Sequence, residues 1–133
     1  MTDLPTPEAA LYQFLAGFGI PAYASTSTPD EGDDEWRGFP YLTYDLVVGE
    51  WGGGEVNVPV NVWYRTDSEA KPNAKVREIA AALGVGGTTV PCQGGMLWLK
   101  KGSPWAQAVR VEGEDEKVKR RYVNINAEYL VLG

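Results

Sequence analysis

The sequence of 133 residues contains no histidine and only one cysteine, Cys92. Without histidine, the chain cannot form a Ser-His-Asp triad, a Cys-His pair or an imidazole metal site. A single cysteine excludes an intrachain disulfide and a zinc site built from several thiolates. No stretch approaches the roughly 18 apolar residues of a membrane span, and the first residues lack the basic start and apolar run of a signal peptide. We therefore expect an intracellular domain that is not an enzyme and that uses no metal or cofactor.

Basic residues are also scarce, because 12 Lys and Arg stand against 18 Asp and Glu and give a net charge of −6. A compact nucleic-acid-binding domain is normally basic, so specific recognition of nucleic acid is not expected. Hydrophobic residues make up 44% of the chain, a composition typical of a folded globular protein. At this length we expect a single domain, residues 1–133, whose core needs no disulfide or metal to stabilise it.

Two segments have the spacing of apolar residues that is typical of an amphipathic helix. Residues 6–17 offer Thr6 as an N-cap and Pro7 in the first turn. Their apolar stripe consists of Leu11, Phe14, Leu15 and Phe18. Residues 68–83 carry a second stripe that ends naturally at Gly84. Its positions are Val76, Ile79, Ala80 and Leu83. Each stripe is one-sided, so each helix needs a single apolar surface to cover.

The remaining pattern predicts strands, which are residues 20–25, 39–51, 55–65, 88–93, 96–101, 106–112 and 118–132. Residues 55–65, EVNVPVNVWYR, alternate valines with other residues, so one side of this strand should be buried. Pro59 cannot donate a ladder hydrogen bond, which predicts an edge strand or a bulge there. In the last strand, five residues should face the core: Val123, Ile125, Ala127, Tyr129 and Val131.

The order helix, strands, helix, strands predicts an α+β fold. Glycine-rich segments such as residues 52–54 join neighbouring strands, so the sheet should be mainly antiparallel or mixed. The two amphipathic helices should pack on one face of this sheet and form a two-layer sandwich with it.

Acidic side chains are concentrated in two short segments. Residues 26–38 are polar and rich in turn-forming residues, so we expect a mobile loop. The carboxylates are Asp30, Glu31, Asp33, Asp34 and Glu35 in this loop and Glu112, Glu114, Asp115 and Glu116 in the second segment. A divalent-cation site is one interpretation, but the spacing does not match an EF-hand loop, and solvated, mutually repelling loops are favoured. The basic run at residues 117–121 should form salt bridges rather than bind phosphate.

Five tryptophans is a high number for this length, and several lie in loops, at strand ends or at outward strand positions. Trp63 alternates with Asn57 and Asn61 on the side of its strand that should face solvent. Aromatic side chains are enriched in the cores of protein interfaces. We therefore select Trp51, Trp63, Trp105, Asn57 and Asn61 as candidate subunit-interface residues.

Three segments together resemble one class of phage protein. They are residues 42–79, LTYDLVVGEWGGGEVNVPVNVWYRTDSEAKPNAKVREI, residues 94–107, GGMLWLKKGSPWAQ, and residues 119–132, KRRYVNINAEYLVL. In element order and strand pattern, roughly residues 39–132 and the preceding helix resemble the tail-terminator, or tail-completion, proteins of long-tailed phages and prophages. The resemblance includes no catalytic motif.

The resemblance implies a structural role in the virion tail, with assembly in the bacterial cytoplasm. Members of this class form a ring, commonly sixfold, that caps the tail tube and meets the head–tail connector. The implied partners are other copies of the chain, the tail-tube protein and the connector protein. DNA would pass through the ring without specific binding, because a lumen lined by the acidic segments would repel phosphate. A ring also requires two different contact surfaces on each subunit.

Three other interpretations stay open. The chain could be a neck or minor tail component at another level of the head–tail joint. It could be a non-catalytic module that binds a host or phage protein. It could also be an enzyme that uses carboxylates or lysine alone, although no motif places a nucleophile beside a base.

Overall fold

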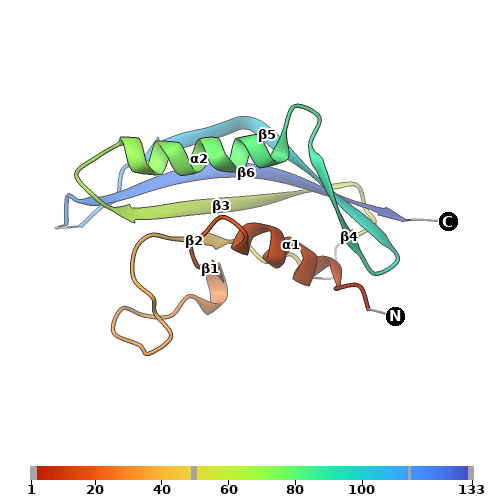
Figure 1. The fold of residues 1–133 in the computed structure, drawn as a ribbon, viewed down its shortest axis with the longest axis horizontal. Helices are drawn as coiled ribbons and strands as arrows, with labels where there is room; N and C mark the ends of the chain where they lie inside the picture. Colours follow the sequence, from red (N-terminus) through yellow and green to blue (C-terminus); the bar gives the residue numbers. More distant parts are fainter. Residues whose placement is uncertain (1–2, 49–50, 114, 132–133) are drawn as a thin grey trace.

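The computed structural model describes residues 3–48, 51–113 and 115–131, and this part of the chain has an α+β fold with two helices and one six-stranded mixed sheet (Figure 1). The elements are α1 (Pro7–Ala16), β1 (Ala22–Ala24), a short 3-10 turn (Ser25–Ser27), β2 (Tyr41–Tyr44), β3 (Glu55–Arg65), α2 (Ala70–Leu83), β4 (Thr88–Cys92), β5 (Gly95–Val109) and β6 (Val118–Val131). The strand order is β1-β2-β3-β6-β5-β4. Only β1 and β2 pair in parallel, and the sheet curls towards a half-barrel.

Both predicted helices form, within a few residues of the predicted limits. The Thr6 hydroxyl accepts a hydrogen bond from the backbone N–H of Ala9 at 3.1 Å, which satisfies a free donor of the first turn of α1. Gly84 follows α2 with a φ of 72°, a conformation that glycine adopts without steric cost. The capping residues predicted from the sequence therefore mark the start of α1 and the end of α2, whereas α2 begins after Glu69 without a side-chain cap.

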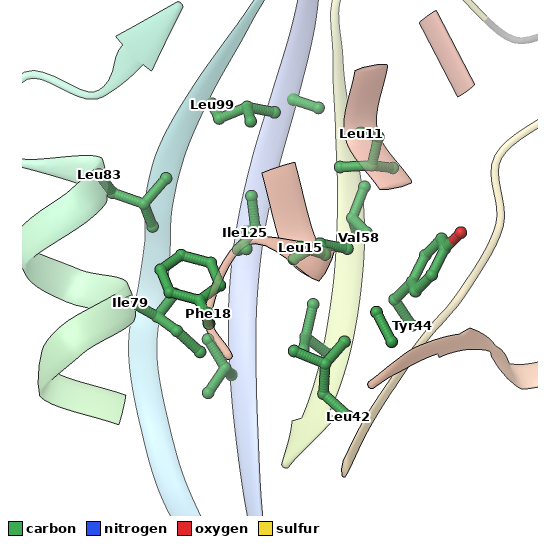
Figure 2. Close-up of a cluster of buried hydrophobic side chains, with 14 of the residues drawn as sticks. Leu11, Leu15, Phe18, Leu42, Tyr44, Val58, Ile79, Leu83, Leu99 and Ile125 are labelled. Atoms are coloured by element: carbon green, nitrogen blue, oxygen red, sulfur yellow. The ribbon is translucent and has the colours of Figure 1, made fainter. Parts of the chain in front are cut away.

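A single hydrophobic core lies between the helices and one face of the sheet (Figure 2). Its fully buried side chains include Leu11 and Leu15 of α1, Ile79 and Leu83 of α2, and the alternating residues Val58, Val60, Val62, Val123, Ile125 and Ala127 of β3 and β6. The predicted alternation of β3 is thereby confirmed. The prediction for Val131 is wrong, because 70% of this residue is exposed at the end of β6.

The prediction that Pro59 marks an edge strand or a bulge is also wrong. β3 lies between β2 and β6 and pairs with β6 without interruption, with Pro59 opposite Asn124. The Pro59 carbonyl accepts a hydrogen bond from the backbone N–H of Asp45 at 3.1 Å. In a strand, the N–H and C=O of one residue point to the same side. The nitrogen of Pro59, which carries no hydrogen, therefore faces away from β6. It faces the side on which β2 has already ended at Tyr44, so the proline interrupts no ladder hydrogen bond.

Two strand limits differ from the sequence prediction. Residues 96–101 and 106–112 were expected to form two strands, but β5 is one long strand whose pairing with β6 shifts between Lys101 and Ala106. Such an irregularity bends a strand without ending it. The strand expected at residues 39–51 is restricted to β2, and residues 49–50 of that range lie outside the described part of the chain.

The edge strand β4 carries a proline of its own. The ladder between β4 and β5 runs unbroken past Pro91, which is opposite Met96. The missing N–H of Pro91 consequently points to the open edge of the sheet. Beyond β4, the backbone N–H of Gln93 donates to the Pro5 carbonyl at 2.8 Å, so the segment before α1 lies against the end of this edge.

Candidate functional site

The sheet has a second face, which lies opposite the hydrophobic core and which we call the open face. Its side chains alternate with the buried residues along the strands, so they point away from both helices. They are Tyr41 and Thr43 of β2; Glu55, Asn57, Pro59, Asn61 and Trp63 of β3; Arg120, Tyr122, Asn124, Asn126 and Glu128 of β6; and Trp98 and Lys100 of β5. The open face is therefore rich in amide, aromatic and charged groups.

Trp63 lies at the centre of a row that crosses three strands. It is opposite Tyr41 of β2 on one side and Arg120 of β6 on the other. The rings of Tyr41 and Trp63 stack with centroids 6.2 Å apart, and the Arg120 guanidinium lies 5.4 Å from the Trp63 ring centroid. The Trp63 indole N–H donates to the Thr43 hydroxyl at 3.1 Å. Trp63 is thus half-buried and held in one orientation on the open face.

A cleft of about 340 Å³, which we call the Trp63 cleft, opens at this end of the sheet. It is lined by Ser25, Thr28, Tyr41, Thr43, Asn61, Trp63 and Arg120. The side-chain Nε of Arg120 donates to Oδ1 of Asn61 at 2.7 Å, which fixes both side chains. The aromatic wall and the hydrogen-bonding groups of the cleft therefore come from three strands and the segment after β1.

The structure does not gather all five candidate interface residues into one patch. Trp63 and Asn61 meet in the Trp63 cleft, and Asn57 lies further along the open face, where its amide donates to Asn126 at 3.2 Å. Trp51 instead packs against the core and donates its indole N–H to Glu8 of α1 at 3.0 Å. Trp105 is also partly buried against the core. Trp51 and Trp105 have packing partners within the subunit, and their interface role stays a prediction.

The loop at residues 26–38 is attached to the edge of the open face by aromatic contacts. Trp36 packs edge-on against Phe39, with ring centroids 5.8 Å apart, and against Tyr41 at 6.5 Å. The backbone N–H of Arg37 donates weakly to the Tyr23 hydroxyl at 3.4 Å. All five carboxylates of residues 30–35 are exposed. The predicted mobility of this loop in the free subunit stays a prediction.

Arg65 lies at the end of β3, which is the end of the sheet opposite the chain termini (Figure 1), and charges from both acidic segments act on it. Arg65 forms an ion pair with Asp115 at 2.8 Å, and the charge of Glu31 also acts on it. The hydrogen bond from Arg65 and a backbone N–H lower the pKa of Asp115. Glu114 lies outside the described residues, and Glu116 is exposed. The described chain contains no cluster of three or more His, Cys, Asp or Glu that could hold a metal ion.

The basic run at residues 117–121 is paired only in part. Lys117 lies 3.8 Å from Asp67, and the buried Arg121 binds Glu69 and also donates to Asn73 at 2.9 Å. These contacts confirm the salt bridges predicted for this run. Arg120, in contrast, is within ion-pair distance of no described carboxylate. Its place in the Trp63 cleft could not be seen in the sequence, because it depends on β6 pairing with β3.

Comparisons of the chain with protein-family models, with curated proteins and with solved structures find no match. Neither α1 nor α2, the two described helices, is long and apolar enough to cross a membrane. The likeness to tail terminators consequently rests on the sequence pattern.

Proposed function

We propose that the chain is a structural subunit of a phage or prophage tail that forms a ring, caps the tail tube and joins it to the head connector. The observation that carries this proposal is the open face, on which a held tryptophan, aromatic neighbours and a row of amides lie without a covering helix. Rigid aromatic anchors surrounded by polar groups are characteristic of protein-binding surfaces. The same interpretation favours a two-layer arrangement, in which the helices form one layer and the curled sheet the other.

A structural role also fits the chemistry that the chain can offer. The chain has no imidazole, the side chain most often used as a general base near neutral pH, and its one thiol is buried. Burial raises the pKa of the Cys92 thiol, with a further contribution from Glu8, so less of the reactive thiolate is present. An assembly subunit needs none of this chemistry.

The acidic segments suit the passage of DNA. Both lie at one end of the sheet and share the neighbourhood of Arg65. In a ring with this end directed inward, the exposed carboxylates of residues 30–35, such as Glu31, would line the opening. A negative lining repels phosphate, so the DNA slides without binding.

The test is the effect of the protein on tail length in a phage that encodes this chain. Without the protein, we expect tails of irregular, excessive length that do not join heads. Supplying Trp63→Ala should give a folded subunit with the same defect, because loss of a central interface anchor typically costs about 2 kcal/mol or more. Tyr12→Ala, on the exposed side of α1, is the matched control and should restore normal tails. Normal tail length and full infectivity in the absence of the protein would contradict the proposal.

A second candidate is another neck or minor tail component, or a non-catalytic binding module. The open face would serve these roles equally well, because it requires only a complementary partner. Tails of normal length that nevertheless fail to join heads would favour the neck component. Normal virions combined with specific capture of one host or phage protein would favour the binding module.

A further inference from the structure

Arg120 of β6 lines the Trp63 cleft and forms an ion pair with no described carboxylate. Lys100 is paired with Glu55, and Arg121 with Glu69, whereas the Arg120 guanidinium contacts only Asn61 and the Trp63 ring. Arg120 is also partly buried. A guanidinium that is partly removed from water gains most from a bidentate contact with an anion.

The hydrogen bonds within the Trp63 cleft determine which atoms are left to bind a ligand. Because Oδ1 of Asn61 accepts from Arg120, Asn61 presents its N–H groups to the cleft. Because the Thr43 hydroxyl accepts from the Trp63 indole, its own hydrogen is free to be donated. The terminal guanidinium N–H groups of Arg120 add further donors. Three neighbouring side chains therefore offer donors, which is the chemistry that recognises an oxyanion.

We propose that the Trp63 cleft binds the side-chain carboxylate of Glu112 or Glu116 of a second copy of this chain. This inference rests on the proposed ring and names one of its contacts. Each copy carries the complementary group, since Glu112 and Glu116 are exposed and pair with no described cation. Asp115 of the same segment is already bound to Arg65. Glu112 and Glu116 lie between β5 and β6, at the end of the sheet opposite the chain termini (Figure 1).

The loop at residues 26–38 is a weaker source of the carboxylate. Its residue Thr28 and the preceding Ser25 line the edge of the cleft, and Trp36 packs against Tyr41. It therefore belongs to the receiving side of the contact. Glu112 and Glu116 lie on the connection between β5 and β6, whereas the Trp63 cleft is lined mainly by β2, β3 and the segment after β1. A contact between these two regions on different copies is head-to-tail, the kind of contact from which rings are built.

The test uses a synthetic peptide of residues 110–119, RVEGEDEKVK, titrated into the full chain labelled with ¹⁵N. The reporter is the indole N–H resonance of Trp63, which donates to Thr43 inside the cleft. We expect a saturable shift of this resonance, and at least tenfold weaker binding of a peptide with Gln at the positions of Glu112 and Glu116. Arg120→Gln should weaken binding to the same extent, whereas Arg77→Gln on the exposed side of α2 should not.

Asn61→Asp provides a second variant in case Arg120→Gln does not fold. It places a negative charge in the cleft and should also abolish binding. An unchanged Trp63 resonance, or equal binding by the wild type and the folded variants, would overturn the proposal. Free glutamate that saturates the cleft as tightly as the peptide would assign the site to a small ligand instead of a second copy. Over-long tails without the protein would still support the ring if the peptide fails to bind, so the two failures are distinguishable.

Discussion

Arg65 forms an ion pair with Asp115 at the end of β3, and the effect of this pair can be measured on the pKa of a single group. Asp115 accepts a hydrogen bond from Arg65 at 2.8 Å, and this bond is the largest cause of its lowered pKa. We expect Arg65→Ala to raise the pKa of Asp115 towards its ordinary value, and NMR titration of the carboxyl carbon would follow the change. Lys101→Ala, in the middle of β5, is the control and should leave this pKa unchanged.

The sign of the pH effect follows from that shift. A carboxyl group with a lowered pKa in the folded state stabilises the fold at pH values above its ordinary pKa. This contribution is lost as the pH falls through the lowered value. Both partners of the pair are exposed, so the effect on stability should be small and should decrease with added salt. An Asp115 pKa that is identical in Arg65→Ala and the wild type would show that the pair does not form in solution.

At the scale of the elements, β5 and β6 are in such close contact that one position tolerates no side chain. A Cβ at Gly95 would lie 1.9 Å from the Leu130 carbonyl oxygen, which is part of the β6 backbone and cannot move aside. Gly95→Ala should therefore lower the free energy of unfolding by about 3 kcal/mol. Gly53→Ala is the control, since a Cβ there meets no atom within 4 Å, and it should change stability by less than about 0.5 kcal/mol. Urea unfolding of the two variants decides the point, and equal midpoints would refute it.

Helix limits and the buried side of β3 could be predicted from the sequence because both depend on local periodicity and capping. Thr6 and Gly84 cap helix ends that lie next to them in the sequence. The buried residues Val58, Val60 and Val62 occupy every second position of one strand, a pattern that the sequence shows directly. The order of the strands could not be predicted in this way. Because β3 pairs with β6, residues about sixty positions apart become neighbours, and this pairing makes β3 a central strand. Pro59 is tolerated there because β2, on the other side of β3, ends at Tyr44.

The residues of the candidate site that lie on one strand could be predicted from the sequence, whereas those that strand pairing brings together could not. Asn61 and Trp63 were found because they alternate with buried valines on one strand. Arg120 was missed because its sequence neighbours are acidic and basic residues, whereas its spatial neighbours are Asn61 and Trp63. Trp51 was assigned to an interface from its residue type, and the structure gives it a hydrogen bond to Glu8 within the subunit. The aromatic residue type predicts that a side chain is buried, but it does not distinguish packing within the subunit from packing against a partner.

At the scale of the whole molecule, the loop at residues 26–38 should respond to assembly. In the free subunit, few of its backbone amides are bonded, and ordering each residue costs about 1–2 kcal/mol of backbone entropy. We expect rapid hydrogen exchange across residues 30–35 in the free subunit and slower exchange in the assembled tail. The amides of β6 provide the internal control, because they are paired on both sides. Strong protection of the loop in the free subunit would contradict this prediction.

The proline on the outer edge of β4 also limits how copies of this protein can meet. An exposed edge strand can act as a template on which another chain adds its own strand, and continued addition produces fibrils. Pro91 removes a donor from that edge, and the bond between Gln93 and Pro5 occupies the next one. At the opposite edge, β1 is only three residues long. Growth of the sheet from one molecule to the next is therefore disfavoured at both edges, which lowers the tendency of the folded protein to form fibrils.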